Sequence, residues 1–86
     1  MSDQISRSVT LNNETGLHAR PASEFVKEAS KYDAKVTVNG VDAKSLLGIM
    51  AMGATKGTEL ALVAEGPEAE AAVNGLVALV ESNFGE

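Results

Sequence analysis

The chain begins with a stretch in which apolar and small polar residues alternate with a period of two. The apolar positions are Ile5, Val9 and Leu11, and the polar positions are Ser6, Ser8 and Thr10. This alternation is typical of a strand with one buried face, so we expect a strand over 5–11, in which Arg7 is the one discordant residue. The segment 12–16, Asn-Asn-Glu-Thr-Gly, is rich in turn-forming residues and is expected to be a loop.

The period then changes to that of a helix. Apolar residues at positions i, i+3, i+4 and i+7 define one helical face; they are Ala22, Phe25, Val26 and Ala29. Pro21 suits only the first turn of a helix, where its missing N–H costs nothing. The predicted helix therefore begins near His18 or Ala19 and ends near Lys31.

The second half of the chain predicts a hairpin, a short helix, a strand and a final helix. Asn39-Gly40, flanked by β-branched residues, is typical of a hairpin with a type I′ turn. Ser45 is the expected N-cap of a short helix that ends before Gly53. An apolar strand over 60–64 and a helix opened by residues 66–68 follow. The order β-α-β-β-α-β-α predicts an α+β open-faced sandwich, a four-stranded antiparallel sheet with three helices on one face.

Composition narrows the function classes. A length of 86 residues favours a single domain over 1–86, and 44% hydrophobic with 22% charged residues is typical of a globular chain. A net charge of −5 and only three aromatic residues argue against a nucleic-acid binder. No cysteine and one histidine exclude disulfides and the usual zinc sites. Apolar runs are far shorter than the roughly 20 residues of a membrane span, and Met1 to Ile5 lack the features of a secretory signal. We therefore expect a cytoplasmic protein without membrane insertion.

The single histidine lies where the first long helix is expected to begin. The first N–H groups of that helix, those of Ala19 and Arg20, lack intrahelical acceptors and form an anion site together with the helix dipole. The Arg20 guanidinium is suited to phosphate oxygens. His18 as nucleophile, these N–H donors and the Arg20 charge are together the parts of a phosphohistidine site. A plainer interpretation is that His18 only caps the helix and Arg20 is a solvated side chain.

Two sequence strings resemble a known family. The string Gly-Leu-His-Ala-Arg-Pro-Ala at 16–22 is similar in all seven residues to the active-site signature of the HPr family, the histidine-containing phosphocarriers of the bacterial phosphoenolpyruvate:sugar phosphotransferase system. The string Lys-Ser-Leu-Leu-Gly-Ile-Met at 44–50 resembles that family's regulatory-serine segment. The resemblance covers almost the whole chain. It implies that His18 accepts a phosphoryl group on Nδ1, that Ala19 and Arg20 surround that group, and that Ser45 is a site of regulatory phosphorylation.

The short helix carries more apolar residues than one buried side can hold. We expect Ile49 in the core and part of the run exposed, and an exposed apolar patch often marks a partner interface, where Met is adaptable. In the family this region and the histidine form the docking face, which implies that Leu46, Leu47 and Met50 contact successive partners. The implied partners are phosphorylated enzyme I and sugar-specific enzyme IIA domains, with an HPr kinase/phosphorylase and a carbon-catabolite regulator as further candidates.

The implied activity is that of a carrier, consumed and regenerated in each cycle rather than a true enzyme. We expect a monomer with no cofactor and no metal. One departure from the family is the hairpin over Lys35–Lys44, which is several residues shorter than in many members. Two alternatives stay open: a specialised paralogue phosphorylated on His18 that signals nitrogen or carbon status, and a regulatory binding domain without phosphotransfer. The sequence names neither the sugars nor the acceptor domains.

Overall fold

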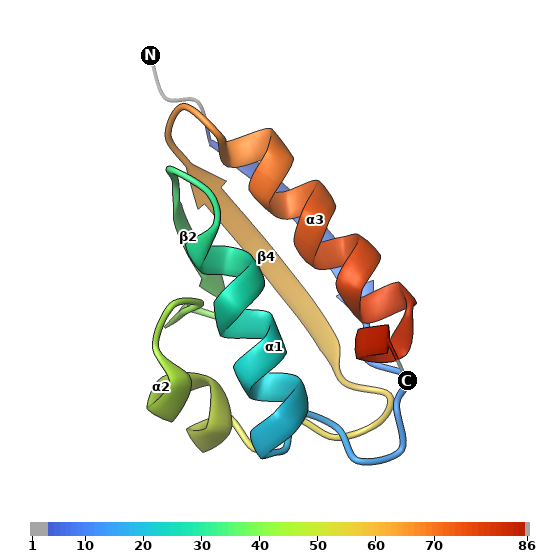
Figure 1. Cartoon of the computed structure of the whole chain (residues 1–86). Coiled ribbons are helices and arrows are strands. Elements are labelled where there is room, and N and C mark those ends of the chain that lie inside the picture. The colour runs from blue at the N-terminus through green and yellow to red at the C-terminus, as the bar shows by residue number, and fades with distance from the viewer. Residues whose placement is uncertain (1–3, 86) are drawn as a thin grey trace.

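The computed structural model describes residues 4–85; residues 1–3 and 86, the ends of the predicted 1–86 domain, lie outside the described residues. The predicted order of strands and helices is confirmed (Figure 1). The elements are β1 Ile5–Thr10, α1 Ala19–Ser30, β2 Lys35–Val38, β3 Val41–Asp42, α2 Leu46–Ala51, β4 Glu59–Glu65, α3 Ala69–Glu81 and a 3-10 turn Asn83–Gly85. Of the described helices, none is both long and apolar enough to cross a membrane.

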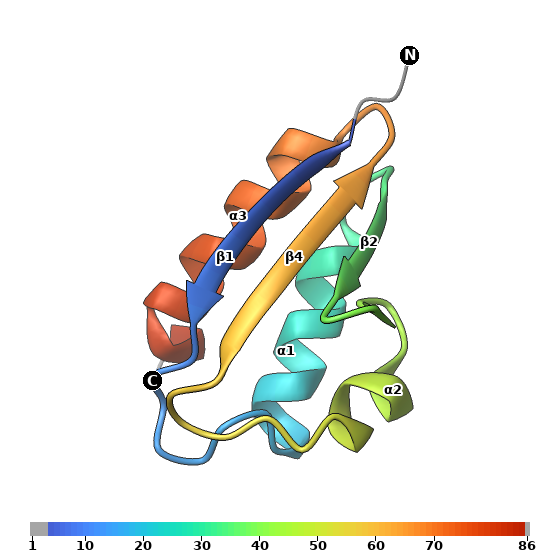
Figure 2. The same cartoon turned by 180° about the vertical axis from the view of Figure 1, so that it is seen from behind.

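The four strands form an antiparallel sheet in the order β1-β4-β2-β3. The helices α1 and α3 lie across one face, and α2 lies beside α1 near the hairpin (Figure 1). From behind, the described chain places no helix over the other face of the sheet (Figure 2). This arrangement confirms the predicted open-faced sandwich.

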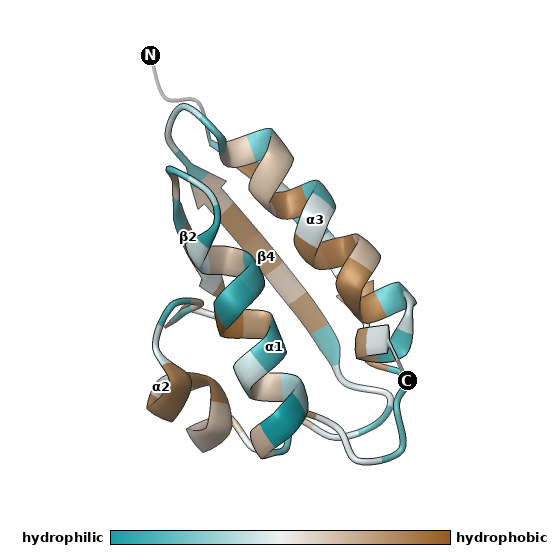
Figure 3. Ribbon diagram, in the orientation of Figure 1, coloured by the Kyte–Doolittle hydropathy of each residue, from teal (hydrophilic) through white to brown (hydrophobic). Residues whose placement is uncertain are grey.

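The core fills the space between the sheet and the two long helices. Along β4 the apolar residues Leu60, Leu62 and Ala64 are fully buried, and they alternate with exposed or half-buried neighbours. The hydropathy colours show the same stripe on β4 and on α3 (Figure 3). Phe25 of α1 is the largest fully buried side chain, and full burial of such a residue contributes about 1.5–3 kcal/mol. Arg7, the discordant residue of the first strand, pairs with Leu62 but stays exposed because β1 is an edge strand.

The turn residues have the conformations that the sequence predicts. Asn39 and Gly40 both have positive φ, at 50° and 81°, as a type I′ turn requires.

The final helix begins at Ala69, slightly later than predicted, because Glu68 is its N-cap residue. Glu68 is tied to the loop after α1: its backbone N–H donates to the Asp33 carbonyl at 3.1 Å, and its Oε1 accepts from the Asp33 N–H at 2.6 Å. The 3-10 turn was not predicted from the sequence; its Phe84 is buried and has φ 60°.

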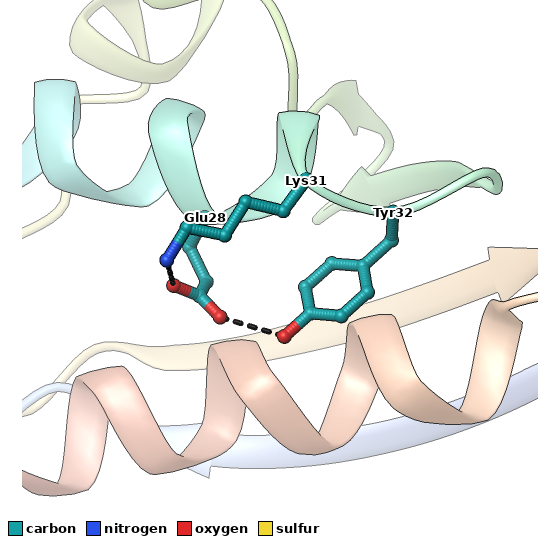
Figure 4. A network of polar contacts seen from close by, with 3 residues as sticks. All are labelled: Glu28, Lys31 and Tyr32. Carbon is teal, nitrogen blue, oxygen red and sulfur yellow. Dashed lines mark hydrogen bonds and ion pairs between the residues drawn. The ribbon is translucent and has the colours of Figure 1, made fainter.

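A small polar network lies at the C-terminal end of α1, on the side that faces α3 (Figure 4). Glu28 Oε2 accepts a hydrogen bond from the Tyr32 hydroxyl at 2.7 Å, and Glu28 Oε1 pairs with Lys31 Nζ at 3.0 Å. Burial alone would raise the pKa of Glu28, but the hydrogen bonds from Tyr32 and then Lys31 outweigh it and lower that pKa. On the α3 side the helix has Gly75, where an added Cβ would meet the Tyr32 hydroxyl and lie 2.7 Å from Glu28 Oε2. An alanine at this position would therefore require the Tyr32 and Glu28 side chains to shift.

Candidate functional site

His18 is the N-cap residue of α1, and its side chain is exposed. Its backbone has φ −73° and ψ −176°, and its carbonyl accepts the first hydrogen bond of the helix from the Ala22 N–H at 2.8 Å. Within residues 4–85 the imidazole makes no capping hydrogen bond. The interpretation of the His18 side chain as a helix cap is therefore wrong, because the side chain is exposed and makes no capping hydrogen bond within the described chain.

Two backbone donors lie directly after the histidine. Ala19 and Arg20 are the first two residues of α1, and both are exposed. N–H groups in the first turn of a helix have no intrahelical acceptor, and Pro21 in third place has no N–H at all. The structure thus brings together the three predicted residues: an imidazole, two unpaired N–H groups and the Arg20 guanidinium on one exposed helix end. This combination can bind an anion bonded to the imidazole.

A second loop holds the segment before His18 in place. Gly16 has φ 63°, and an added Cβ would meet the Ala54 carbonyl oxygen and lie 2.9 Å from Thr55 Cα. The next residue, Leu17, is buried, and its N–H donates to the same Ala54 carbonyl at 3.0 Å. The predicted strand residue Leu11, just past the end of β1, exchanges hydrogen bonds with Thr58 and Gly57. The loop before α1 is therefore fastened to the loop before β4 at both of its ends.

These contacts leave a small cleft beside the histidine. It has a volume of about 200 Å³ and is lined by Leu17, His18, Met50, Gly53, Ala54 and Thr55. Pockets for drug-sized ligands are usually about 300–1,000 Å³, so this cleft suits a small group such as a phosphoryl group or one partner side chain. Residues 53–55 were not predicted from the sequence to belong to the site. Their only signal was the pair of glycines, Gly53 and Gly57, that bracket the polar loop.

The short helix α2 supplies the other wall of the site. Ser45 is confirmed as its N-cap, because its Oγ accepts from the Gly48 N–H at 3.1 Å. The predicted division of the apolar run is also confirmed: Ile49 is fully buried, whereas Leu46, Leu47 and Met50 are 41%, 81% and 41% exposed. Met50 lines the cleft beside His18. The exposed residues, here called the α2 patch (Leu46, Leu47 and Met50), are thus continuous with the histidine.

An ion pair joins the two loops that flank the cleft. Lys56 Nζ and Glu14 Oε1 form an exposed ion pair of 2.7 Å that joins the two loops. The hydrogen bond from Lys56, and then its positive charge, lower the pKa of Glu14. Among residues 4–85 no three carboxylate or imidazole side chains gather where they could hold a metal ion. The cationic group closest in sequence to His18 is therefore Arg20, on a chain whose net charge is −5.

Comparison with known proteins finds the same family over most of the chain. Residues 5–82 match the family model described as the PTS HPr component phosphorylation site. Phosphocarrier protein HPr of Vibrio cholerae is 48% identical, over 87% of this chain and 93% of that protein. A multiphosphoryl transfer protein of Haemophilus influenzae is 44% identical, over 99% of this chain but only 18% of that much longer protein. The crystal structure of HPr-C-His from Thermoanaerobacter tengcongensis superimposes with a TM-score of 0.91 at 44% identity, covering 95% of this chain and 97% of that one.

Proposed function

The chain belongs to the HPr family of phosphocarrier proteins, and on this premise we propose that His18 is the residue that carries the phosphoryl group. One observation supports this assignment above the others. His18 is the single histidine of the sequence, and it is exposed at a helix N-terminus without a capping role for its ring. Its side chain is therefore available for chemistry rather than committed to the fold.

In the proposed reaction, phosphorylated enzyme I is the donor. The Nδ1 lone pair of His18 attacks the phosphorus, a new P–N bond forms, and the bond between phosphorus and the donor nitrogen breaks. Charge is spread over the three phosphoryl oxygens during such a transfer, so positioning and electrostatics provide most of the catalysis. The N–H groups of Ala19 and Arg20 would donate hydrogen bonds to these oxygens, and the Arg20 guanidinium would balance their charge.

The second half of the cycle reverses the first with a different partner. A nucleophile of a sugar-specific enzyme IIA domain attacks the phosphorus, and His18 leaves as a neutral imidazole. Both partners would dock on the α2 patch, because it is apolar, exposed and continuous with the cleft beside His18. We expect the carrier to act as a monomer in the cytoplasm, where it must visit each partner in turn.

We further propose that Ser45 is the site of regulatory phosphorylation, by a kinase of the HPr kinase/phosphorylase type. The hydroxyl is half-buried and caps α2 directly before the α2 patch. A phosphate there would add about two negative charges beside an apolar docking surface and so weaken docking of the phosphorylated donor. A carbon-catabolite regulator that reads this phosphate is the corresponding partner.

The assignment of His18 is tested by labelling. The chain is incubated with enzyme I and phosphoenolpyruvate that carries a radioactive phosphoryl group. We expect stoichiometric, acid-labile label on the wild type, none on His18→Ala, and a transfer rate at least about tenfold lower for Arg20→Ala. A lysine control, Lys31→Ala at the far end of α1, should transfer at the wild-type rate. Label that persists on His18→Ala would exclude His18 as the carrier residue.

One second candidate has a specific observation in its favour. Catabolite repression HPr of Bacillus subtilis, Crh, is 36% identical to this chain, with a TM-score of 0.67 over 88% of this chain and 95% of that one. A specialised paralogue would still take a phosphoryl group on His18 but would signal nitrogen or carbon status. Failure of the phosphorylated chain to transfer its label to any enzyme IIA domain would favour it. A binding domain without phosphotransfer would take no label at all.

A further inference from the structure

Asn13 is the buried polar residue of the described chain, and it lies in the loop that leads to His18. Only 3% of Asn13 is exposed, whereas its neighbour Asn12 is exposed to solvent. Burial of an amide is unfavourable unless its polar atoms are hydrogen-bonded. We therefore expect the buried Asn13 amide to make hydrogen bonds that stabilise the loop.

The side chain of Asn13 closes the loop. Its Nδ2 donates to the Gly16 carbonyl at 2.8 Å and to Thr15 Oγ1 at 3.2 Å. In addition, the Gly16 N–H donates to the Asn13 carbonyl at 3.2 Å. Asn13 thus binds both the N–H and the carbonyl oxygen of Gly16. An oxygen in place of Nδ2 would face the Gly16 carbonyl oxygen with no proton between them, so the amide nitrogen is required on that side.

Gly16 in turn sets the position of the histidine. Its left-handed backbone lies against Ala54 and Thr55, and the N–H of the next residue, Leu17, donates to the Ala54 carbonyl. His18 follows as the N-cap of α1 and lines the cleft with Ala54 and Thr55. Asn13 therefore acts on the site through a chain of contacts that runs from Gly16 to Leu17 and then to His18.

The Asn13 side chain has a second feature, which concerns its amide oxygen. Its Oδ1 is buried and has no hydrogen-bond partner among residues 4–85. An apolar side chain or a small one would avoid an unsatisfied buried oxygen, which is costly in a folded protein. Nδ2 makes both of the side-chain hydrogen bonds of Asn13, so it is the atom through which Asn13 acts on the loop.

We propose that Asn13 is a positioning residue for phosphoryl transfer: its Nδ2 donor to Gly16 holds the imidazole of His18 where the incoming phosphorus can be attacked in line. The proposal rests on His18 as the carrier residue. Misplacement of a reacting group by about 1 Å lowers transfer rates by up to a hundredfold. Loss of the donor should therefore slow the chemical step much more than it weakens docking, because the α2 patch is untouched.

The test compares Asn13→Asp with Asn12→Asp, the same chemical change at the exposed neighbour. Phosphoryl transfer from phosphorylated enzyme I is followed by rapid quench over a range of donor concentrations. For Asn13→Asp we expect a maximal rate lower by about tenfold or more and a half-saturating donor concentration within about twofold of the wild type. Asn12→Asp should match the wild type in both. Amide NMR shifts in Asn13→Asp should change over 11–18 and 53–58 and not elsewhere.

Several results would overturn the proposal. They are a wild-type maximal rate in folded Asn13→Asp, a loss confined to the half-saturating concentration, and unfolding of both Asn13→Asp and Asn13→Ala at the assay temperature. The last would make Asn13 a general stabilising residue. If Asn13→Asp alone unfolds, Asn13→Ala, which also lacks the donor, takes its place with the same expected loss. Failure of the proposed function is distinct, because the wild-type chain itself would then take no phosphoryl group.

Discussion

Replacement of Gly16 by alanine tests the contact that holds the histidine loop, and Gly53 provides a matched control. Both glycines have φ 63°, but their surroundings differ. An added Cβ at Gly16 would meet the backbone of Ala54 and Thr55, whereas at Gly53 nothing lies within 4 Å. The two variants therefore share the cost of a left-handed alanine and differ in the backbone clash.

The magnitudes follow from these two costs. A left-handed alanine costs about 1–2 kcal/mol, and the reduced freedom of the unfolded chain returns about 0.4–1 kcal/mol. Gly53→Ala should thus lower the free energy of unfolding by about 1 kcal/mol. Gly16→Ala adds an overpacking cost of about 1–3 kcal/mol, because backbone rather than a flexible side chain must move. Its total of about 2–4 kcal/mol is a large share of the roughly 5–15 kcal/mol that stabilises a typical domain.

The assay is urea unfolding followed by far-ultraviolet circular dichroism, because the chain has no tryptophan. We expect Gly16→Ala to unfold at a clearly lower urea concentration than Gly53→Ala, with the wild type highest. The folded fraction of Gly16→Ala should also accept phosphoryl groups more slowly, since Leu17 can no longer reach Ala54 in the same geometry. Equal losses of stability in the two variants would refute the contact between Gly16 and the second loop.

Three further substitutions test other parts of the structure. Tyr32→Phe removes the donor to Glu28 and should cost about 0.5–1.5 kcal/mol in urea unfolding at pH 7. Ser45→Ala removes the acceptor for the Gly48 N–H and should cost about 1 kcal/mol in the same assay. Leu47→Ser changes a side chain that is 81% exposed, so the unfolding midpoint should stay the same while binding of phosphorylated enzyme I weakens by several-fold in a titration.

Each of these three substitutions has a result that would contradict its prediction. Because the folded protein lowers the pKa of Glu28, its contribution to stability is present above the ordinary value of 4.5 and is lost as the pH falls through the lowered value. The cost of Tyr32→Phe should therefore shrink between pH 7 and pH 3; an equal cost at both would contradict the role of the carboxylate. Unchanged stability in Ser45→Ala would contradict the cap, and unchanged affinity in Leu47→Ser would exclude the α2 patch as a docking surface.

Much of the fold could be predicted because its signals are local. The alternation along 5–11, the helical period after Pro21, and the Asn39-Gly40 turn each depend on residues that are neighbours in sequence. Gly53 and Ser45 mark the ends of α2 for the same reason. The late start of α3 was harder to predict, because Glu68 is held there by Asp33, a residue 35 positions away. The burial of Phe84 in a left-handed conformation likewise depends on tertiary packing.

The residues of the site likewise fall into those that a local motif predicts and those that only tertiary contacts reveal. His18, Ala19 and Arg20 are consecutive, so their juxtaposition at a helix N-terminus could be predicted from the motif. The contribution of Ala54 and Thr55 could not, because it arises from the contact between two loops about 40 residues apart, made possible by Gly16. Asn13 was also missed. In sequence it is one of two adjacent asparagines in a polar loop, and only the fold shows that one of them is buried.

The central claim, that the imidazole of His18 carries the phosphoryl group, can be measured most directly by NMR of protein labelled with ¹⁵N at histidine. The sequence has one histidine, so the spectrum contains one pair of ring-nitrogen signals. Addition of enzyme I and phosphoenolpyruvate should shift both signals and split that of Nδ1 by coupling to ³¹P, and acid should reverse the change. A phosphorylated chain whose histidine signals stay unshifted and unsplit would contradict the account.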